Sequence, residues 1–172
     1  MILLTARLVL RPIQERDAPD IVALDSDPEV MRYLGHPKST LDLAHTWIEL
    51  ARTYPDGTGY WAAERDGEFI GWFLLRPERA EPHEMELGYR LMQRAWGRGF
   101  ATEGGTELLR HAWRELDVPT VMATTDANNL RSQSVMRKIE MTHAKDFLYD
   151  GRIPSVRYRI ARPASAPNQF QA

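Results

Sequence analysis

Residues 94–105 read RAWGRGFATEGG, a glycine-rich segment that runs directly into a long periodic pattern. Apolar residues recur at roughly helical spacing from Phe100 to Leu116, which predicts a helix that begins near Gly99. The first N–H groups of a helix lack partners within it, and the helix dipole is positive at that end. The segment therefore predicts either an anion site or an ordinary tight turn before a surface helix.

The composition indicates one soluble globular domain. The chain has 172 residues, of which 43% are hydrophobic and 27% are charged, and this length can bury a sizeable core. The formal net charge of −2 gives no reason to expect nucleic acid or an anionic membrane as a partner. Without cysteine, a disulfide framework, a thiolate zinc site and a cysteine nucleophile are all excluded.

The N-terminal stretch MILLTARLVLRPI is apolar but too short to span a bilayer, and it lacks the features of a signal peptide. We expect a strand over residues 3–13, with Arg7 and Arg11 on a solvated face, and a cytoplasmic protein. The five histidines show no ligand spacing, so we expect no metal site.

The patterns downstream predict a mixed α/β chain. Three helices are expected first, then a hairpin and a lone strand, and the glycine segment separates these from a second helix-containing half. In order, the predictions are helices around 17–24, 28–35 and 39–54; a hairpin over 59–75; a strand over 84–91; helices over 100–116 and 128–139 flanking a strand at 119–125; and two strands around Asp150-Gly151. The helix at 128–139 is expected to turn Leu130, Val135, Met136 and Ile139 inward.

Two known phosphate motifs fit the glycine segment poorly. In a P-loop a lysine follows the last glycine, and Gly105 stands there instead. In a dinucleotide-binding fingerprint Thr102 would occupy the third glycine position, and such a turn belongs to the first strand of its domain.

A third motif fits better. RAWGRGFA satisfies R-x-x-G-x-G after the strand ELGYRLM, and it resembles the acetyl-coenzyme A loop of the GNAT superfamily of N-acetyltransferases. The stretch TARLVLRPIQERDAPDI resembles the opening of the ribosomal-protein-alanine (Rim-type) branch. GYWAAERDGEFIGWFLL resembles the central hairpin, and NNLRSQSVMRKIEM resembles the second signature.

The resemblance implies one α/β (α+β) domain over residues 1–163, followed by a tail at 164–172 that we expect to be disordered. The implied GNAT fold has a mixed, mostly antiparallel central sheet that is splayed at the cofactor site, with helices on both faces.

The resemblance also implies acetyl-coenzyme A as cosubstrate, and no metal. Backbone N–H groups of the loop would hold the pyrophosphate, and the pantetheine arm would lie beside the end of the 84–91 strand. Trp96 is expected either to cover the cofactor or to anchor the loop, and Asn129 to cap its helix or contact the pantetheine. The implied cofactor-binding residues are Leu91, Met92, Arg94, Trp96, Gly97, Arg98, Gly99, Phe100, Ala101, Thr102, Asn129 and Ser132.

Acetyl transfer needs an unprotonated amine and a proton for the departing thiolate. Glu86 is our candidate base, ahead of Glu84 on the same strand face, although that face could simply meet solvent. The tyrosine that many superfamily members use as the acid falls on Met136 here. The Rim-type resemblance implies Ser132 instead, whose alternative role is that of a polar residue in the first turn of its helix. Glu140 replaces the glycine usual after that helix, which puts the local geometry in doubt.

The leading hypothesis is an N-acetyltransferase that moves the acetyl group to a primary amine by direct attack in a ternary complex, because no cysteine can carry it. The acceptor would be a protein N-terminal α-amine or a small-molecule amine, with a pocket lined by 31–38 and 147–153. A homodimer is common in the resembling family. The alternatives are a catalytically inactive coenzyme A-binding regulatory or scaffold domain, favoured by Met136 and Glu140, and a nucleotide-binding domain.

Overall fold

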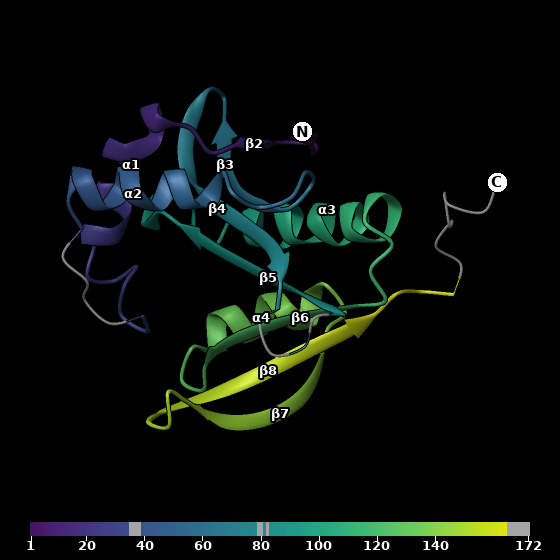
Figure 1. The fold of residues 1–172 in the computed structure, drawn as a ribbon. Coiled ribbons are helices and arrows are strands. Elements are labelled where there is room, and N and C mark those ends of the chain that lie inside the picture. Colours follow the sequence, from purple (N-terminus) through teal and green to yellow (C-terminus); the bar gives the residue numbers. More distant parts are fainter. Residues whose placement is uncertain (35–38, 79–80, 82, 165–172) are drawn as a thin grey trace.

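The structure is a computed structural model that describes residues 1–34, 39–78, 81 and 83–164. In these residues the chain forms one eight-stranded sheet in the order β1-β2-β3-β4-β5-β6-β8-β7 (Figure 1). The strands are β1 (Leu3–Leu4), β2 (Val9–Pro12), β3 (Gly59–Arg65), β4 (Glu68–Pro77), β5 (Glu84–Leu91), β6 (Thr120–Asp126), β7 (Thr142–Tyr149) and β8 (Ile153–Ala161). The helices are α1 (Ala18–Ser26), α2 (Leu41–Ala51), α3 (Phe100–Glu115) and α4 (Leu130–Lys138), with short 3-10 turns η1 (Glu15–Asp17) and η2 (Gln93–Ala95).

Among the strands that the structure describes, one pair of neighbours, β5 and β6, is parallel. Strands β1 to β5 pair antiparallel in sequence order, β5 pairs parallel with β6 after the α3 crossover, and β8 lies antiparallel between β6 and β7. This arrangement confirms the expected mixed, mostly antiparallel sheet.

The alternation of buried side chains along β3 and β4 divides the core into two layers. Ala62, Trp72 and Leu74 pack with α1 and α2 on one face of the sheet. Ala63 and Phe73 pack with α3 and α4 on the other face. Helices therefore cover both faces, as expected, and each face has its own apolar cluster.

Two of the predicted elements are wrong. The strand expected over 3–13 is a small hairpin, because the Thr5 side chain accepts hydrogen bonds from the backbone N–H groups of Arg7 and Leu8 and turns the chain. The helix expected at 28–35 is absent from residues 28–34, which form turns, and residue 35 lies outside the described residues. These turns begin at Asp27, whose side chain accepts a hydrogen bond from the N–H of Glu29. Residues 165–172 of the expected tail lie outside the described residues.

Arg11 is buried, which corrects the expectation of a solvated face. Its guanidinium donates to both carboxylate oxygens of Asp17, at 2.8 and 2.6 Å, and to Glu64 at 2.7 Å. Arg7 remains exposed but is not free, because Glu103 pairs with it at 2.6 Å. Leu130 is likewise misassigned: it is 67% exposed in the first turn of α4, while Met136 and Ile139 face inward as expected.

None of the described helices is long and apolar enough to cross a membrane.

Two adjacent glycines of α3 provide a matched test of this packing. A Cβ at Gly104 would lie 2.3 Å from the buried Phe73 ring, whereas a Cβ at Gly105 would come no closer than 3.4 Å to Ile139. Gly104→Ala is therefore expected to lower the free energy of unfolding by about 1–3 kcal/mol. Gly105→Ala should leave it unchanged or raise it by up to about 1 kcal/mol, since alanine favours the helix. Urea denaturation measures both, and a Gly104→Ala variant as stable as Gly105→Ala would contradict the packing described.

Candidate active site

The sheet is split at the carboxyl ends of β5 and β6. The two strands pair only at Glu84↔Thr120, Met85↔Val121 and Glu86↔Met122. Beyond these pairs β5 stays bonded to β4 and β6 stays bonded to β8, and Figure 1 shows β5 and β6 diverging. The edges that face each other across this gap have no strand partner in the described sheet, so their backbone groups are available to a ligand.

The glycine loop lies at the open end of the gap. Gly97 and Gly99 have φ values of 71° and 82°, in the left-handed region that favours glycine. A Cβ at Gly97 would meet no described atom within 4 Å, so protein packing does not require the glycine there. Gly99 is the N-cap residue of α3, and no described side chain caps this helix. The first N–H groups of α3 and its positive dipole end are thus free for an anion.

Contacts from both sides hold this loop in place. The Nη1 group of Arg7 donates to the carbonyl of Arg98 at 2.9 Å, and Glu103 in the first turn of α3 accepts from Thr5 at 2.6 Å. Burial raises the pKa of Glu103, but the hydrogen bonds from Thr5 and Arg7 outweigh it and hold the pKa below its usual value. The indole N–H of Trp96 donates to the carbonyl of Leu91 at 2.8 Å. Trp96 is therefore an anchor of the loop.

Several predicted cofactor residues make contacts within the protein. The N–H of Met92 donates to the carbonyl of Ile70, and the Arg94 guanidinium donates to the carbonyl of Phe69 at 2.6 Å. With the bond from Trp96 to Leu91, these contacts connect the end of β5 to the start of β4. A cofactor at this point would use other groups of Leu91, Met92 and Arg94.

Helix α4 brings Asn129 and Ser132 to the same gap. The Asn129 side chain accepts from the N–H of Ser132 at 3.1 Å, so it caps the helix, which is one of its two expected roles. Arg131 lies over the ring of Trp96, 5.3 Å from its centre, and this contact places the first turn of α4 beside the loop.

A hydroxyl pair that the sequence did not reveal lies across the gap. The hydroxyl of Tyr89 on β5 is 3.4 Å from the Oγ of Ser132 on α4. Burial raises the pKa of Tyr89 and the contact with Ser132 opposes it, so the phenol is protonated at neutral pH. Met136, at the usual tyrosine position, is buried in the core. Alternation along the strand places Tyr89 on its apolar face with Met85, Leu87 and Leu91, and only the folded chain brings the hydroxyl of a residue 43 positions later beside it.

Glu86 lies on the opposite face of the sheet, at the last pair before the gap. Arg76 donates to its Oε2 from Nε at 2.8 Å and approaches it from Nη2 at 2.7 Å. Arg76 also reaches the hydroxyl of Tyr54 at 3.4 Å. Glu84 pairs with Arg159 at 3.1 Å. Both candidate carboxylates are therefore held in ion pairs rather than exposed alone to solvent.

The face that carries Glu86 also carries an aromatic group and a second ion pair. Arg90 pairs with Asp25 and lies 5.0 Å from the ring centre of Trp72. The rings of Trp47, Tyr54, Tyr60 and Trp72 contact one another edge-on or tilted, between 4.5 and 6.0 Å apart. The rings of Trp47, Tyr60 and Trp72 belong to the apolar cluster between the sheet and helices α1 and α2, so Glu86 and Arg90 lie beside a packed apolar layer.

The two segments expected to line the acceptor pocket are placed only in part. Met31 is buried, and residues 35–38 lie outside the described residues. The turn between β7 and β8 lies at the end of the sheet where the gap opens (Figure 1).

Glu140 adopts the left-handed conformation that the usual glycine would have, with φ 65°. Its N–H donates to the carbonyl of Arg137 and the N–H of Met141 donates to that of Met136, so the helix ends regularly. The strain of a non-glycine residue there is about 1–2 kcal/mol, and it lies at the end of α4 away from Ser132.

In the part of the chain that the structure describes, no group of three or more His, Asp or Glu side chains could hold a metal ion.

Comparisons with known proteins agree with this geometry. Residues 7–142 match the model of the acetyltransferase (GNAT) domain. The chain is 35% identical over 176 residues to FsC-acetyl coenzyme A-N(2)-transacetylase of Aspergillus fumigatus, covering 92% of this chain and 75% of that protein. An acetyltransferase structure from Agrobacterium tumefaciens superposes with a TM-score of 0.78 at 25% identity, covering 94% and 95% of the two chains. RimL, a ribosomal L7/L12 N-acetyltransferase solved with coenzyme A, superposes at 0.80 and 18% identity over 94% and 98%.

The free helix N-terminus, the two left-handed glycines and the open gap fit a pyrophosphate with an extended arm, and the matches name the ligand as acetyl-coenzyme A. The chain therefore belongs to the GNAT family and is an acetyl-coenzyme A-dependent N-acetyltransferase.

Proposed function

We propose that the protein acetylates the α-amine of a small molecule. The observation that carries this proposal is the ion pair between Glu86 and Arg76, because two guanidinium contacts already occupy the Oε2 atom that would otherwise accept a proton. At pH 7 an α-amine with a pKa of about 7.8 is neutral in roughly one molecule in seven, whereas a lysine-like amine is neutral in about one in 2,500. An α-amine therefore makes the smaller demand on such a base.

The relative from Aspergillus fumigatus supports the same acceptor. Its name specifies transfer to an N(2) atom, and this chain is similar to it over most of its length. A protein N-terminus also presents an α-amine, as the name of RimL implies for that enzyme. We favour the small molecule, since the chain is 35% identical to the relative from Aspergillus fumigatus and 18% identical to RimL.

Each part of the gap has its own role in this proposal. The bound cosubstrate supplies an acetyl group activated as a thioester. Backbone N–H groups from Gly97 to Thr102 bind the pyrophosphate, since the N–H of Trp96 already donates to the carbonyl of Gln93, and the end of β5 with Asn129 lines the arm. Glu86 accepts the proton of the amine through water. Ser132, with Tyr89 beside it, donates a proton to the departing sulfur. The amine enters on the α1/α2 face and attacks directly, and the thiol leaves toward α4.

The reaction itself tests the choice of acceptor. Lysine amide acetylated on its ε-nitrogen leaves only the α-amine free, and the isomer acetylated on the α-nitrogen leaves only the ε-amine. We expect kcat/KM at pH 7 to be at least about tenfold higher for the first, in line with the larger neutral fraction of its amine. Equal or reversed values would contradict the proposal. A short peptide with a free N-terminus shows whether a protein terminus is the better acceptor.

Removal of the two hydroxyls tests the acid. Ser132→Ala and Tyr89→Phe should each lower kcat by about 10–100-fold, with the KM for acetyl-coenzyme A changed by less than about threefold. Tyr89→Phe keeps the ring contact with Phe73, so its melting temperature should match that of the wild type. Because the two groups act as a pair, the double variant should lose little more than the worse single variant. A double variant with unchanged kcat would show that neither hydroxyl supplies the proton.

Substitution of Glu86 tests the base. Glu86→Gln should lower kcat/KM by about 10–100-fold at pH 7, and the loss should shrink as the pH rises toward 9, because more of the amine is then neutral without help. Glu84→Gln removes a second paired carboxylate from the same strand face and is the matched control, with an expected change below about threefold. If Glu84→Gln is the more damaging of the two, the roles are assigned to the wrong carboxylate.

We place the reaction in the cytoplasm, where acetyl-coenzyme A is available. The absence of cysteine fits such a reducing compartment. A homodimer, common in the resembling family, is part of the same proposal, and its mass in solution tests it.

A further inference from the structure

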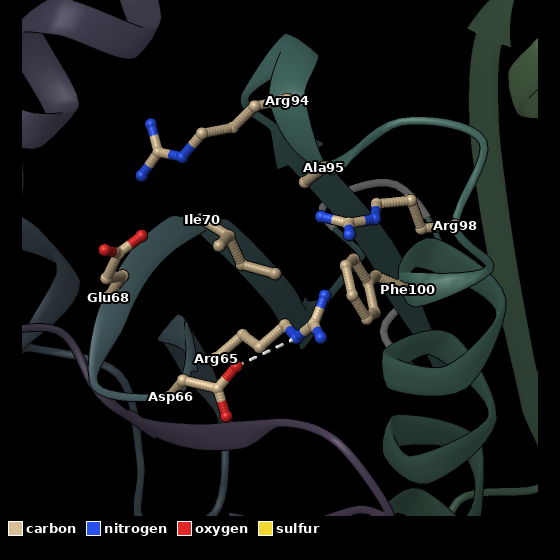
Figure 2. A pocket seen from close by; sticks show the side chains of 8 residues that line it. All are labelled: Arg65, Asp66, Glu68, Ile70, Arg94, Ala95, Arg98 and Phe100. Atoms are coloured by element: carbon tan, nitrogen blue, oxygen red, sulfur yellow. Dashed lines mark ion pairs between the residues drawn. The ribbon is translucent and has the colours of Figure 1, made fainter.

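A hollow of about 240 Å³ lies beside the glycine loop, between the loop and the turn that joins β3 to β4. Figure 2 shows its walls: the β3–β4 turn on one side, η2 on another and the start of α3 on the third. The residues that line it are Arg65, Asp66, Glu68, Ile70, Arg94, Ala95, Arg98 and Phe100. Arg94, Arg98 and Phe100 are among the implied cofactor-binding residues, but the roles assigned above place no ligand group in the hollow itself.

Three guanidinium groups gather around one buried ring in its wall. The guanidinium carbons of Arg7, Arg65 and Arg98 lie 4.6, 5.3 and 5.8 Å from the centre of the Phe100 ring. Figure 2 shows those of Arg65 and Arg98 on either side of the ring. Each is attracted by the ring, but the three positive charges repel one another unless anions lie among them.

The carboxylates nearby neutralise this cluster only in part. Glu103 pairs with Arg7. Asp66, which is largely exposed, pairs with Arg65 through Nε at 3.2 Å, and Glu68 also lines the hollow. Among the described residues the Arg98 guanidinium makes no ion pair or side-chain hydrogen bond, so its donors remain available.

The position of Arg98 indicates what this charge could bind. Arg98 stands between the two left-handed glycines of the loop, and the backbone N–H groups of that loop serve a pyrophosphate. Coenzyme A carries a third phosphate, on the 3′ position of its ribose, which the backbone groups leave unmatched. Guanidinium groups bind phosphate through paired hydrogen bonds, and a dianion would offset the repulsion around Phe100.

We propose that Arg98 and Arg65 bind the 3′-phosphate of coenzyme A in this hollow. Arg98 supplies the main contact from the loop, and Arg65 reaches the same group from the β3–β4 turn, held in position by Asp66. The inference rests on the function proposed above, since it takes the loop to be the pyrophosphate site. With these contacts, Arg98 and Arg65 make the site prefer coenzyme A to nucleotide analogues that lack the 3′-phosphate.

Binding of coenzyme A and of 3′-dephospho-coenzyme A, measured by calorimetry without an acceptor, tests this directly. The wild type should bind coenzyme A at least about tenfold more tightly, a difference of about 1.4 kcal/mol. Arg98→Ala should weaken binding of coenzyme A by a similar factor while leaving dephospho-coenzyme A almost unaffected, so that the two affinities converge. Arg65→Ala should reduce the difference in part.

Two further arginine variants serve as controls. Arg114→Ala removes the same charge at the far end of α3 and should keep the wild-type difference. Arg131→Ala removes the guanidinium over Trp96 on the other side of the loop, and it should also keep the difference.

The proposal is overturned if the wild type binds the two ligands equally, if Arg98→Ala weakens both by the same factor, or if the difference disappears in Arg131→Ala instead. Arg98 is exposed, so its loss should not unfold the protein, and the melting temperature of each variant checks this. Failure of both ligands to bind the wild type would instead contradict the cosubstrate site itself.

Discussion

The protein depends on a break in its own sheet. Backbone N–H and C=O groups must find hydrogen-bond partners, and β5 and β6 supply them to each other over only three residue pairs. Past Glu86 the two strands separate while each remains firmly bonded on its outer side, to β4 and to β8. The sheet therefore offers an extended ligand two free strand edges on a rigid frame, and the loop at the mouth of this gap offers the N–H groups of a helix end.

The gap also separates the two proposed proton-transfer roles in space. Glu86 faces α1 and α2, whereas Tyr89 and Ser132 meet on the side of α3 and α4, because neighbouring positions of a strand point to opposite faces. An amine that enters from one face and a thiol that leaves toward the other do not compete for the same group. In the proposed mechanism the ion pair between Arg76 and Glu86 influences acceptor choice, since Arg76 occupies one of the two carboxylate oxygens of Glu86.

Local patterns predicted the fold and the loop well. The alternation in β5, the glycines before α3 and the cap at Asn129 are encoded by residues that lie next to one another in the sequence, and so they could be read from it. The misassigned features depend on distant partners. Arg11 is buried because Asp17 and Glu64 neutralise it, and a strand pattern alone gives no sign of Glu64 53 positions away. Leu130 fits a helical pattern but stands at the exposed first turn of α4.

The candidate site shows the same division. The glycine loop and the start of α3 form one continuous segment, so their conformation could be predicted, whereas the contact between Tyr89 and Ser132 joins a strand to a helix across the gap. The cluster around Phe100 draws on the N-terminal hairpin, the β3–β4 turn and the loop, three segments that only the folded chain brings together.

Hydrogen exchange of the backbone amides, with and without saturating acetyl-coenzyme A, tests the central claim most directly. The account predicts strong additional protection at residues 97–102 and along the gap-facing edge of β5, with little change in the amides of β3 or of the middle of α3. Protection that appears elsewhere, or none at all in the loop, would contradict the assignment of this helix end and this gap as the acetyl-coenzyme A site.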